Sequence, residues 1–272
     1  AVSSAQSIAK NTYGINIGGL DTPASALLVK DYLAKIDWNI SDSQRASVRF
    51  SRTEQTEPIY PNFGATALST DSNWYSQAKT IDSVVGQWIA DWTPNFSTEA
   101  KVSSRKYDSV PVNNSNLPQI GLSFSGALPT GAPAGLSTGS RTLYFGTERS
   151  RHTNVLATDT VDGYLGATYT YKNHELKFGG DYSENKVYNA FLQDTKGNYT
   201  FGCINSGATL SYANPLNAGG ITCSSATQAQ VEAAVLENFQ RGRPTSYQVQ
   251  SPLPGRTPVS YTHLRAHETD SY

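Results

Sequence analysis

Apolar and polar residues alternate along three stretches of the chain. Over residues 30–40 most even positions are apolar and most odd positions are polar. Residues 41–43 read Ser-Asp-Ser, and the alternation resumes over residues 44–53. Because successive side chains of a strand point to opposite faces of a sheet, this pattern predicts an antiparallel hairpin with one apolar and one polar face.

Two further hairpins follow the same plan. One alternates over residues 84–92 and 96–105 around a Thr-Pro-Asn turn. The other alternates over residues 160–171 and 176–183 around a polar turn at 172–175. The three units together predict about six strands in consecutive hairpins.

The connections between the hairpins are much longer than the turns inside them. They cover residues 53–79, 108–159 and about 189–258, and are rich in Gly, Ser, Asn, Pro and Thr. Such loops are uncommon in compact soluble domains. Short turns at one end, long loops at the other and strands of about nine to eleven residues are typical of outer-membrane barrels. We therefore expect an all-β fold, an antiparallel transmembrane β-barrel fragment with open edges.

The two faces of the predicted sheet suit a membrane. Aromatic side chains on the apolar face gather near the short turns, as interfacial Trp and Tyr do. A soluble sheet with one face in a core would also alternate, but it would not explain the unequal loops. The residues expected to face lipid or to form an aromatic belt are Trp38, Trp88, Trp92, Phe96, Tyr169, Tyr171 and Phe178.

Charged side chains fall on the opposite positions and are expected to face a lumen. They either form a hydrated lining of ion pairs that also holds a plug domain, or they line a substrate path. Polar lumen residues are the rule in such barrels, which favours the first interpretation. The lumen-facing residues are Lys35, Asp37, Arg45, Arg49, Glu99, Lys101, Arg105, Lys177 and Asp181.

Composition narrows the class further. Only 16% of the 272 residues are charged, yet the mean hydropathy is −0.44, so polar uncharged residues dominate. No run is long and apolar enough for a transmembrane helix, and 11% aromatic residues argue against disorder. A net charge of −1 gives no case for a nucleic-acid partner. Methionine is absent, so either a signal segment was removed or the chain is an internal piece of a longer protein, and the departing C-terminal pattern leads us to expect the second.

Three segments resemble the barrel of TonB-dependent outer-membrane receptors of the Oar-like group, whose members usually carry a carboxypeptidase-regulatory-like domain. They are KIDWNISDSQRASVRFSRTE (35–54), LYFGTERSRHTNVLATDTVDGYLGATYTYKNHELKFGGDYSENKVYNAFL (143–192) and FQRGRPTSYQV (239–249). The resemblance implies energy-coupled uptake of a large or scarce solute through a plugged barrel of about 22 strands. The implied partners are outer-membrane lipid, the plug domain of the parent chain, TonB and an unidentified extracellular ligand. The plug and the TonB box are missing from this sequence, so the fragment alone would not transport.

The last residues depart from the pattern. PVSYTHLRAHETDSY (258–272) resembles a peptide encoded by sequencing-adapter read-through. We expect residues 259–272 to add no strand, residues 30–258 to form the partial barrel and residues 1–29 to be a loop or edge segment leading into it. His263 and His267 have the spacing of zinc ligands on a helix, but they lie in this tail without a third ligand.

The sequence contains no arrangement of residues that indicates catalysis. Neither a Ser/His/Asp nor a Cys/His pattern is recognisable, so we expect no enzyme activity, no cofactor and no metal. His152 and His174 are expected to be solvated or hydrogen-bonded. Residues 225–241 are the only helix candidate, with Thr227 or Ser225 as its cap, and this helix either covers the pore mouth or fills space in a loop.

Cys203 and Cys223 are expected to form a disulfide. They are the only cysteines and lie in one long loop, which would face the oxidising exterior. Free thiols are the alternative; a metal would need two further ligands.

Two functions remain for the chain in the cell. The first is a segment of a transporter or receptor barrel in the bacterial outer membrane, whose ligand the sequence leaves open between siderophore, cobalamin, carbohydrate, peptide and protein. The second is a secreted, soluble β-rich adhesin or carbohydrate-binding module.

Overall fold

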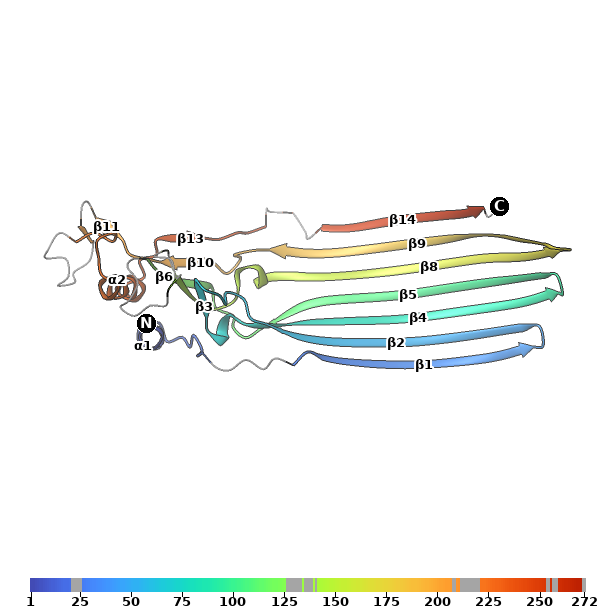
Figure 1. Ribbon diagram of the computed structural model, residues 1–272, viewed down its shortest axis with the longest axis horizontal. Helices are drawn as coiled ribbons and strands as arrows, with labels where there is room; N and C mark the ends of the chain where they lie inside the picture. Colours follow the sequence, from blue (N-terminus) through green and yellow to red (C-terminus); the bar gives the residue numbers. More distant parts are fainter. Residues whose placement is uncertain are drawn as a thin grey trace.

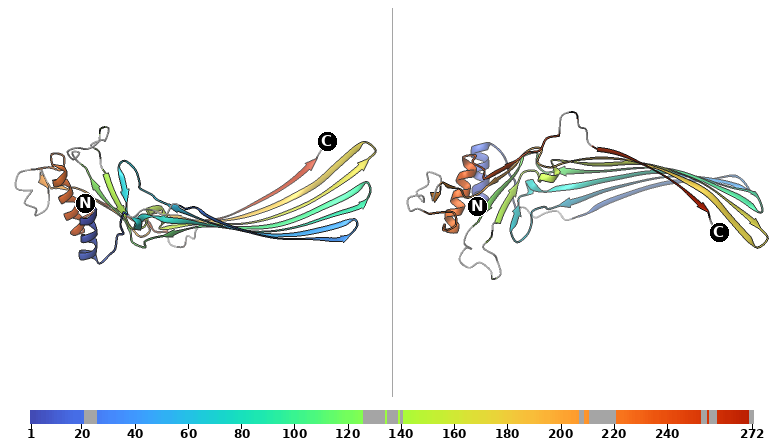
Figure 2. Two further views of the ribbon diagram at one scale, coloured as in Figure 1. Left: turned by 60° about the horizontal axis from the view of Figure 1, so that its bottom comes forward. Right: turned by 90° about the horizontal axis from the view of Figure 1, so that it is seen from above.

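The structure, a computed structural model, is elongated, with a long twisted sheet at one end and a compact unit of short strands and helices at the other (Figures 1 and 2). It describes residues 1–20, 26–125, 134, 139, 141–206, 209–210, 221–252, 255 and 259–270, with the backbone alone for 206, 209–210 and 259–270. We call the long sheet the wall and the compact unit the cap.

The wall is a seven-stranded antiparallel sheet in the order β1-β2-β4-β5-β8-β9-β14. Its edge strands, β1 and β14, each pair on one side within the sheet, so the wall is open. The hairpins and the open antiparallel sheet confirm the predicted fold class. The strands are β1 (Leu28–Ser41), β2 (Gln44–Ile59), β4 (Tyr75–Thr93), β5 (Phe96–Asn113), β8 (Thr153–Tyr171), β9 (His174–Leu192) and β14 (Val259–Asp270).

The wall strands are longer than the sequence predicted. The first six have 14 to 19 residues, so β2 and β4 extend into both ends of the segment 53–79 that was expected to be a loop. Backbone pairing continues past the apolar stretch because Thr-, Ser- and Tyr-rich segments also suit a sheet with two solvated faces. The strands are therefore longer than a tilted transmembrane span requires.

The expectation that the tail adds no strand was wrong. β14 pairs with β9 from Val259 opposite Asn189 to Asp270 opposite Phe178. The edge of β9 offers a row of unpaired N–H and C=O groups, and an extended segment can satisfy these with its backbone whatever its side chains are.

The cap contains a five-stranded sheet in the order β13-β10-β6-β7-β3, which the sequence analysis treated as loop. β10 and β6 are parallel, as are β3 and β7, so the connections between the wall hairpins meet in one sheet. The elements outside the wall are β3 (Ala67–Ser69), β6 (Gln119–Phe124), β7 (Arg141–Phe145), β10 (Asn198–Phe201), β11 (Asn205–Ser206), β12 (Thr209–Leu210), β13 (Ser246–Gln248), α1 (Val2–Tyr13), α2 (Gln228–Gln240) and the 3₁₀ turns η1 (Asp71–Asn73) and η2 (Arg149–Arg151).

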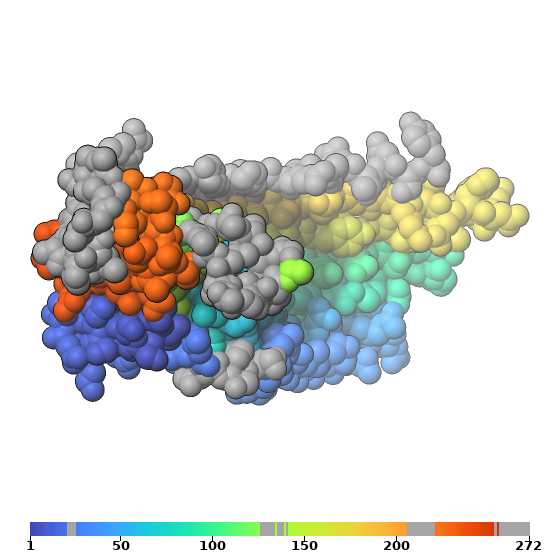
Figure 3. All heavy atoms as spheres, turned by 60° about the vertical axis from the view of Figure 1, so that its left-hand side comes forward, coloured from blue at the N-terminus to red at the C-terminus, as the bar shows by residue number. Residues whose placement is uncertain are grey.

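Two helices lie side by side on the cap, and Figure 3 shows them at its surface. α2 confirms the helix predicted within 225–241, and Thr227 caps it with Gln230 in a reciprocal capping box. α1 was not predicted: residues 1–29 begin with a helix that ends at Gly14, whose φ of 69° suits glycine. Its buried residues Ala5 and Ala9 lie one turn apart on a single face, so the helical spacing was present in the sequence and was overlooked.

The buried core of the protein lies in the cap. Phe239 of α2 is 1% exposed and packs edge to face on Phe145 of β7 and Phe201 of β10. Ala5 and Ala9 of α1 bury into the same cluster. The wall contributes little to this core, because both of its faces are open. None of the helices in the described residues is long and apolar enough to cross a membrane.

Candidate functional site

The register of the wall sorts its side chains onto two faces, since residues directly opposite each other in an antiparallel pair share a face. Ala46, Trp88, Ala100, Leu165 and Gly180 lie opposite one another in one continuous row across five strands. We call the face that carries this row the apolar face.

The neighbouring row points to the other side of the sheet. It consists of Ser47, Gln87, Lys101, Tyr164 and Asp181, again paired strand by strand. We call this side the charged face.

Every lumen candidate lies on the charged face, and every aromatic candidate lies on the apolar face. Lys35 lies opposite Arg49, whereas Trp38, three positions along β1, lies opposite Ala46. Trp92 follows a register shift, but its ring meets that of Trp88 at 5.7 Å, which places it on the apolar face. Which of the two faces meets lipid stays a prediction.

The apolar face carries an uncharged band that begins at the short turns. On β4, for example, the positions on this face from Trp92 to Val84 are uncharged, and Asp82 is the first charged residue. The other five strands of the three hairpins repeat this layout at similar distances from their turns. The first charged residues on the apolar face are Lys30, Arg52, Asp82, Lys106, Asp159 and Glu184.

This boundary was missed in the sequence, although each strand contains the signal. Within one strand it is only the first charge at apolar parity. It becomes a limit when the register aligns Arg52, Asp82, Lys106 and Asp159 side by side. Arg52 donates from Nε to Glu54 Oε1 at 2.8 Å and from Nη1 to Asp82 Oδ2 at 3.2 Å, so charges at the boundary pair with one another. The band below it spans roughly the ten residues that a tilted transmembrane strand needs.

The three turns are offset in a way that indicates tilted strands. Asp91 N donates to Ser43 O of the first turn at 2.7 Å, before β4 reaches its own turn at Pro94. Thr170 N donates in the same way to Asn95 O at 2.8 Å, before the turn at Lys172. Each turn thus extends roughly 7–10 Å beyond the last while the sheet advances about 10 Å sideways. If the turns lie at one membrane level, the strands tilt by about 40°, as in outer-membrane barrels.

Polar side chains pair along the charged face. Lys35 Nζ lies 2.7 Å from an oxygen of Asp37, and Gln87 Nε2 donates to Glu99 Oε1 at 2.7 Å. Ser183 Oγ donates to Asp162 Oδ1 at 2.7 Å. These contacts pair many of the polar groups on the charged face with one another. Among the described residues no group of three His, Cys, Asp or Glu could hold a metal ion.

An ion pair with a buried carboxylate joins the cap to the wall. Arg149, in the 3₁₀ turn before β8, donates through Nε and Nη2 to the two carboxylate oxygens of Asp194 at 3.1 and 2.6 Å. The Asp194 side chain is 1% exposed, and its main chain bonds to Arg149, Gly197 and Gln250. Gln119 of β6 accepts from Arg149 N at 2.9 Å. We call these contacts the Arg149–Asp194 cluster. The cluster fixes the β9–β10 connection against the start of β8.

His152 is buried next to the Arg149–Asp194 cluster. Its Nδ1 accepts from Lys196 N at 3.2 Å, so the ring proton sits on Nε2, which donates to Thr147 O at 3.1 Å. Burial lowers the pKa of His152 below its usual value, although the bond to Thr147 opposes the shift. The neutral ring is therefore a structural bridge. His174 begins β9 and is exposed, and the side chains of His263 and His267 lie outside the described residues.

Cys203 and Cys223 are bonded to each other. Their Cα atoms lie 5.9 Å apart, and the bridge closes a separation of 20 residues. Cys203 follows β10 and Cys223 precedes α2, so the bond joins the cap sheet to the helix that covers it.

The family model described as Outer membrane beta barrel domain matches residues 6–269. The chain belongs to this family. Membership places the chain in the bacterial outer membrane, in contact with lipid, as the sequence pattern indicated. It also tells against the secreted soluble module that was the alternative. Searches of curated proteins and of solved structures gave no match.

For an outer membrane beta barrel domain, the geometry of the wall has a direct use. A sheet with an uncharged band on one face and ion pairs on the other can separate hydrocarbon from water. The cap is built from the long connections between the wall hairpins. In such barrels the long connections face the exterior.

Proposed function

We propose that the chain is a wall segment of a TonB-dependent transporter or receptor that takes up a large or scarce solute. The apolar face contacts lipid, the charged face lines the lumen, and the cap covers the outer mouth. The observation that carries this proposal is the uncharged band of the apolar face, bounded by charges such as Arg52 and Asp82 on neighbouring strands.

We also propose that the complete barrel is large. The six strands of the three hairpins twist without closing on themselves (Figure 2), so a closed barrel needs further strands. Large outer-membrane barrels either leave an aqueous channel or hold a plug in the lumen. The ion-paired charged face suits contact with a plug, and the resemblance of residues 35–54, 143–192 and 239–249 to TonB-dependent receptors supports coupling through one. We assign no enzymatic activity to the chain.

The orientation of the faces is testable with two adjacent positions on β5. Ala100 lies on the apolar face and Lys101 on the charged face. The native cysteines are bonded, so Ala100→Cys and Lys101→Cys each introduce one free thiol. Each thiol is labelled with a nitroxide before the protein is reconstituted in lipid vesicles. We expect the label at position 100 to be relaxed mainly by oxygen, which concentrates among lipid chains, and the label at position 101 mainly by a water-soluble nickel chelate. The reverse selectivity would overturn the orientation.

TonB coupling needs its own test on the full-length protein that contains this chain. We expect it to bind the purified periplasmic domain of TonB, and binding to be lost when its plug is removed. A full-length protein that inserts into outer membranes without binding TonB would leave the wall assignment standing and contradict the coupling.

A further inference from the structure

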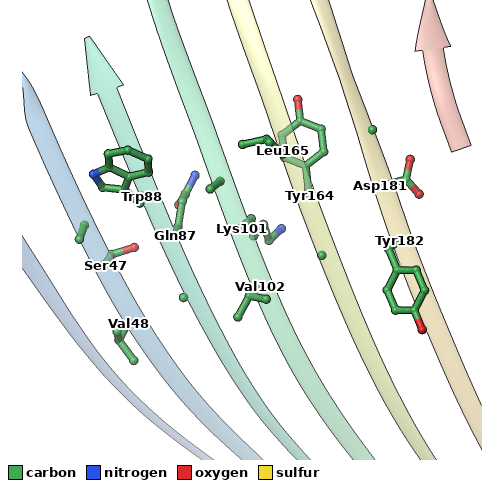
Figure 4. A pocket seen from close by; sticks show the side chains of 15 residues that line it. Ser47, Val48, Gln87, Trp88, Lys101, Val102, Tyr164, Leu165, Asp181 and Tyr182 are labelled. Carbon is green, nitrogen blue, oxygen red and sulfur yellow. The ribbon is translucent and has the colours of Figure 1, made fainter. Parts of the chain in front are cut away.

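The apolar face is hollowed at its centre. An open groove of about 800 Å³ crosses β2, β4, β5, β8 and β9 (Figure 4). Two adjacent rows of the apolar face form the two sides of the groove, and the backbone of the charged-face row between them forms its floor. One side is the row Ala46, Trp88, Ala100, Leu165 and Gly180, and the other is the row Val48, Gly86, Val102, Gly163 and Tyr182.

Small and large side chains alternate along these rows, and this alternation makes the hollow. A Cβ atom added at Gly86 or at Gly163 would meet nothing within 4 Å, so the space above both is open. In the other row Leu165 is 61% exposed and stands between Ala100 and Gly180. The groove is therefore a feature of residue choice on an otherwise regular strand register.

The Trp88 side chain, on one side of the groove, is held in place by its neighbours. The Trp88 ring packs at 80° against Trp92, and Trp92 Nε1 donates to Thr98 Oγ1 at 2.8 Å. Neither indole lies loose over the sheet, so the groove is preformed.

The distance of the groove from the charged boundary indicates which part of a lipid it meets. Gly86 and Val102 lie four positions from the boundary charges Asp82 and Lys106 on the same strands, which is about 13 Å along a strand. Headgroups belong at the charged boundary, so the groove lies at the level of hydrocarbon. Its lining is largely apolar, and it is continuous with the rest of the lipid-facing band.

We propose that this groove is a binding site for one acyl chain of a membrane lipid, held in preference to the lipid around the rest of the wall. The proposal rests on the proposed function, because it requires the apolar face to meet lipid. A flexible acyl chain can follow the steps between Trp88, Leu165 and the glycines, which a flat protein surface cannot fill without voids.

The test uses the full-length protein in phosphatidylethanolamine and phosphatidylglycerol vesicles that contain a phosphatidylcholine with a diazirine in its acyl chain. Crosslinked residues are mapped by mass spectrometry. We expect a yield per residue about tenfold higher in the groove than elsewhere on the apolar face, as a tenfold affinity difference gives. Equal yields along the whole face would overturn the proposal, as would yields in the groove below those on the rest of the face, which indicate that something other than lipid covers it.

Filling the groove provides the matched comparison. Gly86→Leu with Gly163→Leu should abolish the excess labelling, because both side chains have open space to occupy. Ala34→Leu adds the same side chain to the apolar face outside the groove and should leave the excess unchanged. Excess labelling that survives filling contradicts the site. Labelling confined to the charged face would instead refute the orientation of the wall.

Discussion

Arg149 Nη2 lies 2.6 Å from Asp194 Oδ2, and through this contact the start of β8 holds the connection after β9. Asp194 is almost fully enclosed, whereas 37% of the Arg149 side chain is exposed. The two halves of the pair should therefore differ in what their removal costs, since only the carboxylate would be left buried without a counterion.

We predict that Arg149→Met lowers the free energy of cap opening by about 3 kcal/mol, because a buried carboxylate loses its partner. Amide hydrogen exchange across residues 194–201 measures this. Lys35→Met removes the solvent-exposed pair with Asp37 and should change stability by less than about 1 kcal/mol. Equal effects of the two substitutions would contradict the role of the Arg149–Asp194 cluster in holding the cap to the wall.

His152 makes the cap sensitive to acid. Its folded pKa is lowered, chiefly by burial, so the unfolded chain takes up the proton first. The stability it contributes is complete above about pH 6.5 and is lost as the pH falls from there towards the folded pKa. Protonation also removes the acceptor for Lys196 N.

We expect exchange at Lys196, corrected for its intrinsic rate, to be faster at about pH 5.5 than at about pH 7.5. His152→Gln should flatten this dependence. A dependence that persists in the variant would assign the acid sensitivity to another group.

The disulfide should stabilise the packing of α2 on the cap. Replacing both Cys203 and Cys223 by Ser should cost roughly 3 kcal/mol for a loop of this length. The change is measured by exchange in α2. Alkylation of the non-reduced protein followed by mass spectrometry gives the direct check, and two reactive thiols would show that the bond does not form.

A charge placed in the uncharged band should impair insertion. Val102→Lys puts an ammonium group among lipid chains at a cost of about 2–4 kcal/mol near the bilayer midplane, and less near its edges. Gln87→Lys adds the same charge on the charged face, beside Glu99, and should be tolerated. The amount of folded protein in outer-membrane fractions distinguishes the two. Equal losses would indicate that both faces are solvated.

The wall could be predicted from the sequence because its information is local. Two-residue alternation from Tyr32 to Ile40 and the polar turn at residues 41–43 are enough to place a hairpin, and the register then follows from the turn. The same local reading placed α2, because Thr227 marks its start and Gly242 lies just past its end.

The cap could not be predicted in this way because its contacts are distant in sequence. The parallel pairs of β10 with β6 and of β3 with β7 join short segments that carry little periodicity on their own. β14 failed for a different reason: a free edge accepts any extended backbone, so side-chain pattern gives no warning. The groove required the register of five strands before its glycines came together.

The cap core also sets an order of events during biogenesis. Ala5 and Phe239 belong to one buried cluster, and Tyr13 Oη donates to Phe239 O. Everything between them, including the three hairpins, lies within that span of chain. In the proposed orientation, the cluster can therefore close only after the chain through Phe239 has reached the cell exterior. The wall would then insert without its cover, and sealing of the outer mouth would come last.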